Sequence, residues 1–261
     1  MKFAKHAGAA FAGALFGMVA TQPAMAQTSS ASTSAVAGWE FTIAPYFWTA
    51  GLEGNVGAFG LPEVSVDAGF SDILDNLNFA AMAMAEVRRE RFGIFLDVIY
   101  LDLETDGSDT PGPLFSTASV TATTRIITPM LEYRIREHNG ASVDGMAGAR
   151  IWYAETGINL AGGTLSGRGA TDDETWVDPA VGLKGRVPIA KNWALGGWGI
   201  IGGFGAGSDF MWDVFFGVNY AFNDWFSGEV GYRGMGTDFR DNGYVFDVTM
   251  NGPVLAAVFR F

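Results

Sequence analysis

Alternation between apolar and polar residues is the feature that most restricts what this chain can fold into. In residues 212–222 every second residue is bulky and apolar, and the residues between them include Asp213 and Asn219. Residues 177–187 repeat the pattern, with Arg186 among the polar positions. A period of two places one set of side chains on each face of a β-strand. The chain is therefore predicted to be built from strands that have one apolar and one polar face.

The chain lacks the long apolar segment of a membrane-spanning helix. Hydrophobic residues make up 49% of the sequence and aromatic residues 14%, with 36 glycines. No stretch after residue 26 reaches the roughly 18 apolar residues that such a helix requires, whereas a strand crosses a membrane with about 9–11 residues. We therefore predict an all-β fold, a transmembrane antiparallel up-and-down β-barrel whose apolar faces contact lipid. A soluble lipid-binding barrel is the disfavoured alternative, because those faces would contact water.

Turn residues divide the chain into ten strand-like segments. The connections alternate between short and long, and outer-membrane barrels have short periplasmic turns and longer outer loops. Ten strands return the C-terminus to the periplasm. Eight or twelve remain possible, because residues 63–66 in the long loop 52–75 suit an extended hairpin. The predicted strands are residues 38–51, 76–90, 92–104, 118–136, 142–158, 174–188, 192–206, 209–222, 225–239 and 243–261.

The N-terminus has the features of a cleavable signal peptide. Lys2 and Lys5 precede an apolar stretch at residues 7–20, and Ala24-Met25-Ala26 forms a small-x-small cleavage site. We therefore predict a signal peptide at residues 1–26, a flexible periplasmic tail at residues 27–37 and the barrel at residues 38–261. A retained membrane anchor is the alternative. Export of a barrel predicts a location in the outer membrane of a Gram-negative cell, with outer-membrane lipid and lipopolysaccharide as its surroundings.

Composition and motifs argue against several functions. The net charge of −12 disfavours nucleic acid as a partner, because that needs a basic face. The chain has no cysteine, hence no thiolate metal site. His138 lies in a predicted periplasmic turn without a nucleophile beside it. Carboxylates in residues 172–174 and 238–241 leave acid–base catalysis as an unfavoured alternative. We predict no catalytic residues, no metal site, no cofactor and no enzymatic activity.

The period of two also predicts which charges line the lumen. Acidic and basic residues are nearly balanced there, which favours pairing in a narrow interior. A ten-stranded barrel is close to the size that side chains fill. We expect a narrow porin-like channel, and glycines such as Gly217 and Gly231 would leave space for it. A plugged structural or adhesin-like barrel with its function in the outer loops is the alternative. The predicted lumen residues are Glu86, Arg88, Asp97, Glu132, Arg134, Arg150, Asp178, Lys184, Arg186, Asp213, Glu229, Arg233 and Asp247.

Aromatic residues recur where strands are predicted to meet the periplasm. Such rings favour the headgroup level of a membrane, so they predict a periplasmic aromatic girdle. Its members are Trp39, Phe92, Trp193, Trp225, Phe259 and Phe261. The terminal Phe261 follows alternating apolar residues, which is similar to the signal read by the outer-membrane barrel assembly machinery. That machinery is therefore an expected partner of the C-terminal strand.

Two local features add further predictions. Ser71 is suited to cap a helical turn at residues 72–75, and this turn, with Phe70, Ile73 and Leu74 on its apolar side, is predicted to cover the barrel mouth. In the last strand the apolar phase shifts by one residue across Asn251-Gly252-Pro253. Because glycine and proline both mark breaks in a ladder, we predict a β-bulge at this point.

Several stretches resemble a widespread proteobacterial family of outer-membrane β-barrels, described as porin-family or opacity-type proteins. They are Trp39-Glu40-Phe41, Pro45-Tyr46-Phe47-Trp48, residues 70–77 and 95–103, Trp176-Val177-Asp178-Pro179, residues 202–210, Gly231-Tyr232-Arg233 and Gly252-Pro253. The resemblance spans nearly the whole predicted mature chain. It implies the barrel fold and an outer-membrane location, and it implies no particular activity. Trp198 and Ile200 stand where related proteins tend to have an arginine and an acidic residue.

Overall fold

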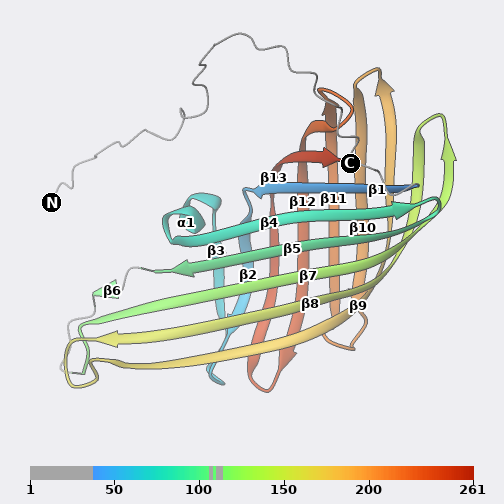
Figure 1. Cartoon of the computed structure of the whole chain (residues 1–261). Helices are drawn as coiled ribbons and strands as arrows, with labels where there is room; N and C mark the ends of the chain where they lie inside the picture. Colours follow the sequence, from blue (N-terminus) through green and yellow to red (C-terminus); the bar gives the residue numbers. More distant parts are fainter. Residues whose placement is uncertain (1–37, 106–107, 110–113) are drawn as a thin grey trace, which may run out of the picture. The chain divides into compact units, whose positions relative to one another are not determined.

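The computed structural model describes residues 38–105, 108–109 and 114–261. The predicted signal peptide and periplasmic tail lie outside these residues. In the part that is described, no helix is both long and apolar enough to cross a membrane. An antiparallel sheet that closes on itself dominates the structure (Figure 1).

Ten strands form the closed wall. Each pairs with its neighbour along the chain, and β13 pairs with β1 to complete the circle. This confirms the predicted antiparallel ten-stranded barrel. Its strands are β1 (Trp39–Trp48), β4 (Leu77–Arg89), β5 (Phe92–Glu104), β7 (Thr117–His138), β8 (Ala141–Ala161), β9 (Arg168–Ala190), β10 (Trp193–Gly203), β11 (Phe210–Ala221), β12 (Phe226–Asp241) and β13 (Tyr244–Arg260). The β7–β8 and β8–β9 hairpins extend farther than predicted (Figure 1).

Four shorter elements lie in the longer connections. β2 (Gly51–Gly57) and β3 (Val64–Ala68) form a hairpin, followed by helix α1 (Phe70–Asp75); β6 (Ser108–Asp109) pairs with β7. β2 pairs with β13 in the register that β1 sets, so β2 continues β1 after a short interruption. The segment that the sequence offered for an extended hairpin therefore forms one.

The two ends of the barrel differ in their connections. Two-residue turns join Arg89 to Phe92 and His138 to Ala141. Asn139 and Gly140 have φ of 51° and 75°, the left-handed conformation that tight hairpins require. We call the end with these turns the short-turn end, and the end that carries the β2–β3 hairpin and α1 the long-loop end.

An apolar band surrounds the outside of the wall. On β9 the outward residues Val181 and Leu183 are 47% and 58% exposed. On β5 the outward apolar positions run from Phe92 to Tyr100 and stop before Asp102. These nine residues match the length of a tilted strand that crosses a bilayer. Large apolar side chains this exposed on every side suit contact with lipid rather than water.

The polarity of the two faces reverses at the long-loop end. On β5 the apolar Leu101 and Leu103 face inward, whereas Asp102 and Glu104 face outward. Each strand keeps its alternation, so the reversal reflects a change of surroundings. Below Tyr100 the outside is the apolar band and the inside holds charged residues such as Asp97 among apolar side chains, whereas above it the charged residues lie outside and the inside is apolar.

The same reversal corrects two predictions on the last strand. The register between β12 and β13 is unbroken from Phe259 to Tyr244, so the predicted bulge at residues 251–253 is absent. Phe246 and Met250 face inward with the even-numbered residues of the whole strand. Asp247 therefore lies on the outside, not in the lumen. Its side chain accepts a hydrogen bond from Arg240, 2.9 Å away. The apparent phase shift in the sequence marks the exchange of environments.

Inward glycines make room for a ring rather than a channel. A Cβ on Gly217 or Gly231 would lie 2.6 or 2.5 Å from atoms of the Phe215 ring. The ring lies flat across both positions and is 3% exposed. The space that these two glycines were expected to leave for a channel is therefore filled.

Candidate functional site: a charged plug beneath an apolar chamber

Four charged residues meet at mid-height in the lumen. Asp97, Arg150, Asp213 and Arg233 come from β5, β8, β11 and β12, and each is at most 1% exposed. We call these four residues the central plug. Two carboxylates and two guanidinium groups make its formal charge zero, which allows them to be buried together.

Arg233 joins opposite walls of the barrel. Its Nη2 donates to Asp97 Oδ2 at 2.6 Å and to Asp213 Oδ2 at 2.7 Å, and its Nη1 donates to the Tyr46 hydroxyl at 2.9 Å. The Tyr46 hydroxyl donates to Asp97 Oδ1 at 2.8 Å. The network therefore crosses the lumen from β12 to β1 and β5.

Arg150 and Trp198 complete the layer. Arg150 forms an ion pair with Asp213 and donates from Nε to the Thr128 hydroxyl at 2.9 Å. The Trp198 indole N–H donates to Asp213 Oδ1 at 3.1 Å. Asp213 thus receives hydrogen bonds from two arginines and a tryptophan. Charge-assisted bonds of this kind are about twice as strong as neutral ones.

A second cluster lies below the central plug. Arg88 forms ion pairs with Glu86, Glu132 and Asp144, with its Nη1 3.3 Å from Asp144 Oδ1. Lys184 pairs with Glu86 at 2.7 Å and with Glu132. Arg134 and Asp144 also pair, which brings six of the described lumen charges into one network. The cluster lines a cavity of about 790 Å³ at the short-turn end.

The other predicted lumen residues are more dispersed. Asp178 is fully buried and accepts from the Trp152 indole at 3.0 Å and from the Ser208 backbone N–H at 2.6 Å. Arg186 lines the short-turn cavity and is exposed. Glu229 lines the same cavity and accepts from Asn219 at 3.1 Å.

Asp247 belongs instead to a surface group around Arg240. Arg240 also donates to Glu63 at 2.8 Å and to Asp238 at 3.2 Å. The hydrogen bond with Glu63, followed by that with Asp247, raises the pKa of Arg240. The group ties the β2–β3 connection to the outside of β12 and β13.

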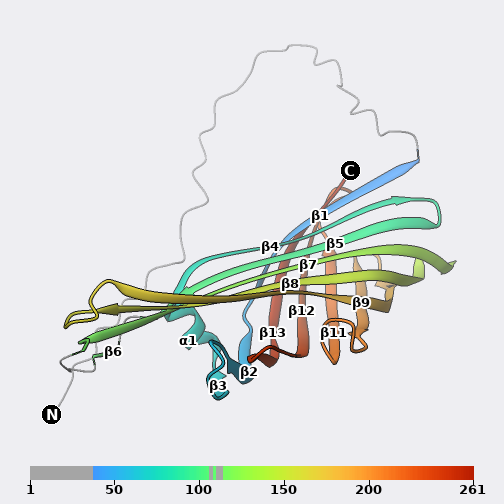
Figure 2. The same ribbon diagram turned by 90° about the horizontal axis from the view of Figure 1, so that it is seen from below.

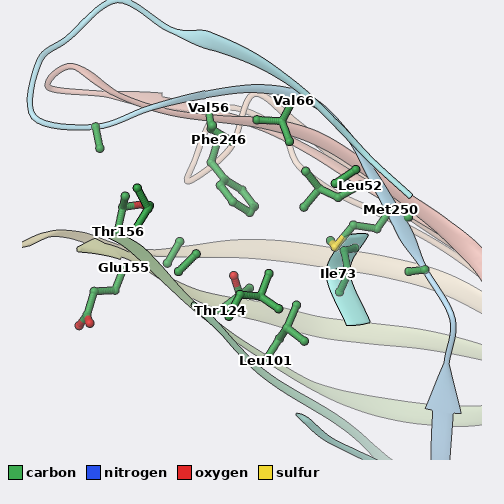
Figure 3. Close-up of a pocket in the computed structure, with 18 of the residues that line it drawn as sticks. Leu52, Val56, Val66, Ile73, Leu101, Thr124, Glu155, Thr156, Phe246 and Met250 are labelled. Carbon is green, nitrogen blue, oxygen red and sulfur yellow. The ribbon is translucent and has the colours of Figure 1, made fainter. Parts of the chain in front are cut away.

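A second cavity lies at the long-loop end. It has a volume of about 410 Å³ and is lined by residues of β1, β2, β3, β4, β5, β7, β8 and β13 together with α1. We call it the outer chamber. Leu52, Val66, Leu101 and Phe246 point into the open space in Figure 3. The volume falls in the range of about 300–1,000 Å³ that ligand pockets occupy.

Charge is nearly excluded from the outer chamber. Glu155 is the one charged residue among its described lining, and its side chain points away from the open space in Figure 3. Its carboxylate accepts a hydrogen bond from Tyr153 on the outer face of β8. The other polar side-chain groups of the described lining are the hydroxyls of Thr124, Thr156 and Tyr244 and the indole N–H of Trp48, which donates to the Gly252 carbonyl. The chamber therefore suits an uncharged apolar molecule.

The central plug separates the two cavities. Trp48 lines the outer chamber and Trp198 lines the short-turn cavity. The Arg233 guanidinium carbon is 5.3 Å from the ring centroids of both residues. Stacking of arginine on aromatic rings is itself favourable. The barrel interior thus consists of a polar cavity, a charged plug and an apolar chamber, in order from the short-turn end.

Helix α1 lies beside the chamber, where the sequence predicted a turn. Phe70, Ile73 and Leu74 line the chamber, as the apolar side of a mouth-covering turn should. The cap differs from the prediction. The helix begins two residues earlier, with Gly69 as N-cap, and Asp72 accepts from the Gly69 N–H at 2.9 Å. Ser71 is exposed in the first turn.

The predicted girdle residues all lie at the short-turn end. Phe92, Trp193, Trp225 and Phe261 are 46–69% exposed there. Phe92 and Trp193 pack against Tyr133 and Tyr220, with centroids 5.3 and 4.7 Å apart. Trp39 lies under the Arg89 guanidinium, and Phe259 packs against Phe226 at 5.2 Å. Phe261 exchanges backbone hydrogen bonds with Phe41. Their role at a membrane surface stays a prediction.

No histidine is among the described residues that line the outer chamber. His138 ends β7 at the short-turn end, at the opposite end of the barrel from that chamber. In the described ranges no group of three or more histidines and carboxylates is placed to hold a metal ion. The expectation that the chain is not an enzyme stays a prediction.

Solved structures share this architecture. The outer membrane protease OmpT of Escherichia coli superposes with a TM-score of 0.55 at 10% identity, over 85% of this chain and 97% of that one. The chain has the fold of an outer-membrane β-barrel. The translocator domain of the autotransporter NalP of Neisseria meningitidis gives a TM-score of 0.43 at 14% identity, over 86% and 88% of the two chains. Ail, the attachment invasion locus protein of Yersinia pestis, gives 0.35 at 12% identity, over 86% and 99%.

Sequence comparison adds no assignment. No family model matches the chain, and no curated protein matches it. At such low identity the structural matches establish the fold alone. Function must therefore be argued from the plug and the chamber.

The sequence analysis did not identify the outer chamber. On the last strand the prediction that Asp247 faces the lumen places its neighbours Phe246 and Met250 on the lipid side, whereas both face the interior. The sequence Leu101-Asp102-Leu103-Glu104 does indicate the change: its leucines lie on the face of the strand opposite to that of Phe92 and Tyr100. The same change on the last strand was interpreted as a bulge.

Proposed function

We propose that this chain is an integral outer-membrane barrel that is closed to ions by its central plug and binds an uncharged apolar molecule in its outer chamber. One observation carries the proposal: a cavity of about 410 Å³ with an almost wholly apolar lining lies above a fully buried layer of paired charge. The opacity-type resemblance is compatible with this role and implies no activity of its own.

The central plug favours a closed barrel rather than the narrow channel that the sequence predicted. An ion that passed this height would have to displace hydrogen bonds among Asp97, Asp213 and Arg233. Removing one partner from a buried ion pair costs about 3–5 kcal/mol, so spontaneous opening is rare. The lumen charges therefore act as a structural layer.

The chamber supports binding because its lining is unfavourable in water. Leu101 is half-buried and Leu74 is exposed, and full burial of such a side chain is worth about 1.5–3 kcal/mol. A water-filled chamber forgoes this energy at many positions, and an apolar guest recovers it. Thr124 and Thr156 offer hydroxyls to an uncharged polar atom on such a guest.

Photolabelling in lipid vesicles tests the binding. The probe is a small uncharged aryl diazirine, which forms a carbene that inserts into nearby bonds, and labelled residues are identified by mass spectrometry. We expect saturable labelling of Leu101 and Leu52 in the chamber, and non-saturable labelling of the lipid-facing Leu131. Chamber labelling that rises in proportion to the lipid-facing signal, without saturation, contradicts a binding site.

A matched pair of variants locates the site. Ala122→Trp fills the chamber from β7, and Thr123→Trp places the same ring on the outer face of the same strand. We expect Ala122→Trp to abolish saturable labelling of Leu101, and Thr123→Trp to preserve it. Planar-bilayer recordings of the folded wild-type protein should show no discrete conductance steps, and reproducible steps would refute the closed barrel.

A further inference from the structure

The barrel wall is incomplete beside the outer chamber. β1 pairs with β4 only as far as Pro45 and Ala83. Beyond that point β2 pairs with β13 on one side and with β3 on the other. Within the described residues no pairing joins β3 to β4. Two strand edges therefore border a gap at the long-loop end, and α1 lies next to the β2–β3 hairpin at this place (Figure 2).

The gap begins within the outward apolar band. Ala83, the last residue of β4 that pairs with β1, lies opposite Val98 of β5. The outward apolar positions of β5 continue past Val98 to Tyr100. The gap therefore begins at the level of Val98, one outward-facing residue before the apolar band ends at Tyr100. In a membrane this level corresponds to the outer leaflet.

Phe47 shows that the outer surface and the chamber are continuous. It lies on the outward face of β1, two residues beyond Pro45, and is 48% exposed. It also lines the outer chamber. Its ring also contacts the ring of Phe70, another residue of the chamber lining, so the outer surface and the chamber meet at this place. Leu74 of α1, which lines the chamber as well, is likewise 48% exposed.

Helix α1 occupies the gap as a short strap. Its Phe70 ring meets the Phe47 ring edge-on, with centroids 5.9 Å apart. Its C-terminal end is tied toward β5, because the Glu104 N–H donates to the Asn76 carbonyl at 2.8 Å. A six-residue helix has little stability of its own. Separation of the Phe47 and Phe70 rings would widen the opening without breaking a barrel strand pair.

We infer that the gap between β3 and β4 is a lateral portal through which an uncharged apolar molecule passes between the outer leaflet and the outer chamber, with α1 as its lid. The inference rests on the proposed function and specifies the source of the ligand. The absence of arginine and lysine from the described chamber lining disfavours a phosphate-bearing lipid, which would need such partners. An apolar solute dissolved in the membrane needs no polar partner.

Chemical cross-linking of the lid tests the portal. The chain has no cysteine, so Phe47→Cys with Phe70→Cys gives one reactive pair across the gap. The folded protein in vesicles is treated with a short bis-maleimide and mixed with vesicles that carry the aryl diazirine. Timed flashes then measure how fast Leu101 becomes labelled relative to the lipid-facing Leu131. The untreated double variant is the reference.

A second cysteine pair controls for cross-linking itself. Phe79→Cys with Tyr100→Cys joins β4 and β5, which are already hydrogen-bonded, at a ring separation of 5.7 Å. We expect the lid cross-link to slow labelling of Leu101 by about tenfold or more, as closure of a lid does. The control cross-link should leave the rate unchanged, and Phe70→Ala should raise it.

The outcomes separate the portal from the binding site. Unchanged loading rates after the lid cross-link, with saturable labelling at equilibrium, would overturn the portal and leave the proposed function standing. Loss of saturable labelling in the wild-type protein would overturn both. Fast labelling of Leu101 from a water-soluble uncharged diazirine in the cross-linked protein would assign access to the barrel mouth instead.

Discussion

Arg233→Met is the sharpest test of the central plug. Methionine keeps the apolar volume between Trp48 and Trp198 but removes the guanidinium group that bridges Asp97 and Asp213. Two buried carboxylates then share Arg150 as the remaining cation of the plug. The formal charge of the layer changes from zero to −1 in a site where all four wild-type residues are at most 1% exposed.

The magnitude follows from that imbalance. Breaking a buried ion pair by removing one partner costs about 3–5 kcal/mol, because it leaves an uncompensated charge. Adding Asp97→Asn to Arg233→Met returns the layer to zero charge, with Arg150 and Asp213 still paired. The double variant should therefore have a free energy of unfolding about 1–3 kcal/mol higher than that of Arg233→Met. This is the cost of leaving a buried polar group without a partner.

Urea unfolding of the refolded barrel in lipid vesicles measures these changes through tryptophan fluorescence and the mobility of the folded species on gels. Arg240→Met is the matched control on the same strand. Arg240 also contacts several carboxylates, Glu63, Asp238 and Asp247, but it is exposed, so its replacement should cause no resolvable loss. The reasoning is refuted if Arg233→Met unfolds at the wild-type urea concentration, or if the double variant is less stable than the single one.

Three further predictions concern the wall. Val181→Arg should prevent assembly into the outer membrane, since a charge on the lipid face costs about 2–4 kcal/mol near the midplane. The control Thr175→Arg, on the same face above the apolar band, should assemble. Equal levels of the two variants in membrane fractions would disprove the predicted orientation of the strand faces. Deleting Phe261 should lower the amount of heat-modifiable barrel in cells, and undiminished levels would remove the C-terminal residue as an assembly signal. Gly217→Ala should destabilise the barrel by about 1–3 kcal/mol through overpacking, because the new Cβ would lie 2.6 Å from an aromatic ring; Gly199→Ala, where a Cβ meets nothing within 4 Å, is the control in the same unfolding assay.

The strands were predictable from the sequence because their signal is local. A period of two, interrupted by turn residues such as Asn139-Gly140, specifies a hairpin whatever the rest of the chain does. The ten barrel strands therefore appear within a few residues of their predicted bounds, and the extended hairpin in residues 52–75 appears as β2 and β3. Twelve of the thirteen predicted lumen charges face the interior or line the short-turn cavity, with Asp247 as the exception.

The partners of those charges were not predictable. Arg233 lies one strand from Asp213 but reaches across the lumen to Asp97, 136 residues earlier in the chain. Such a contact depends on the pairing of β1 with β13 and on the width of the barrel. Neither follows from the separation of Asp97 and Arg233 in the sequence. Closure of the barrel brings these charges into contact, so they pair with one another instead of lining an open pore as a selectivity filter would.

The sequence by itself determined that each strand has two faces, that the strands are antiparallel neighbours and that one end of the barrel carries aromatic rings. Only the tertiary structure decided what each face meets. Phe246 and Met250 are lipid-facing in the predicted phase of the last strand, yet they line a chamber, because above the apolar band the apolar face of the strand is turned to the enclosed space. Alternation is a property of the strand, whereas the environment of a face depends on its height in the barrel. The gap between β3 and β4 also depends on tertiary structure, since it exists only where β3, rather than β4, pairs with the strand that continues β1.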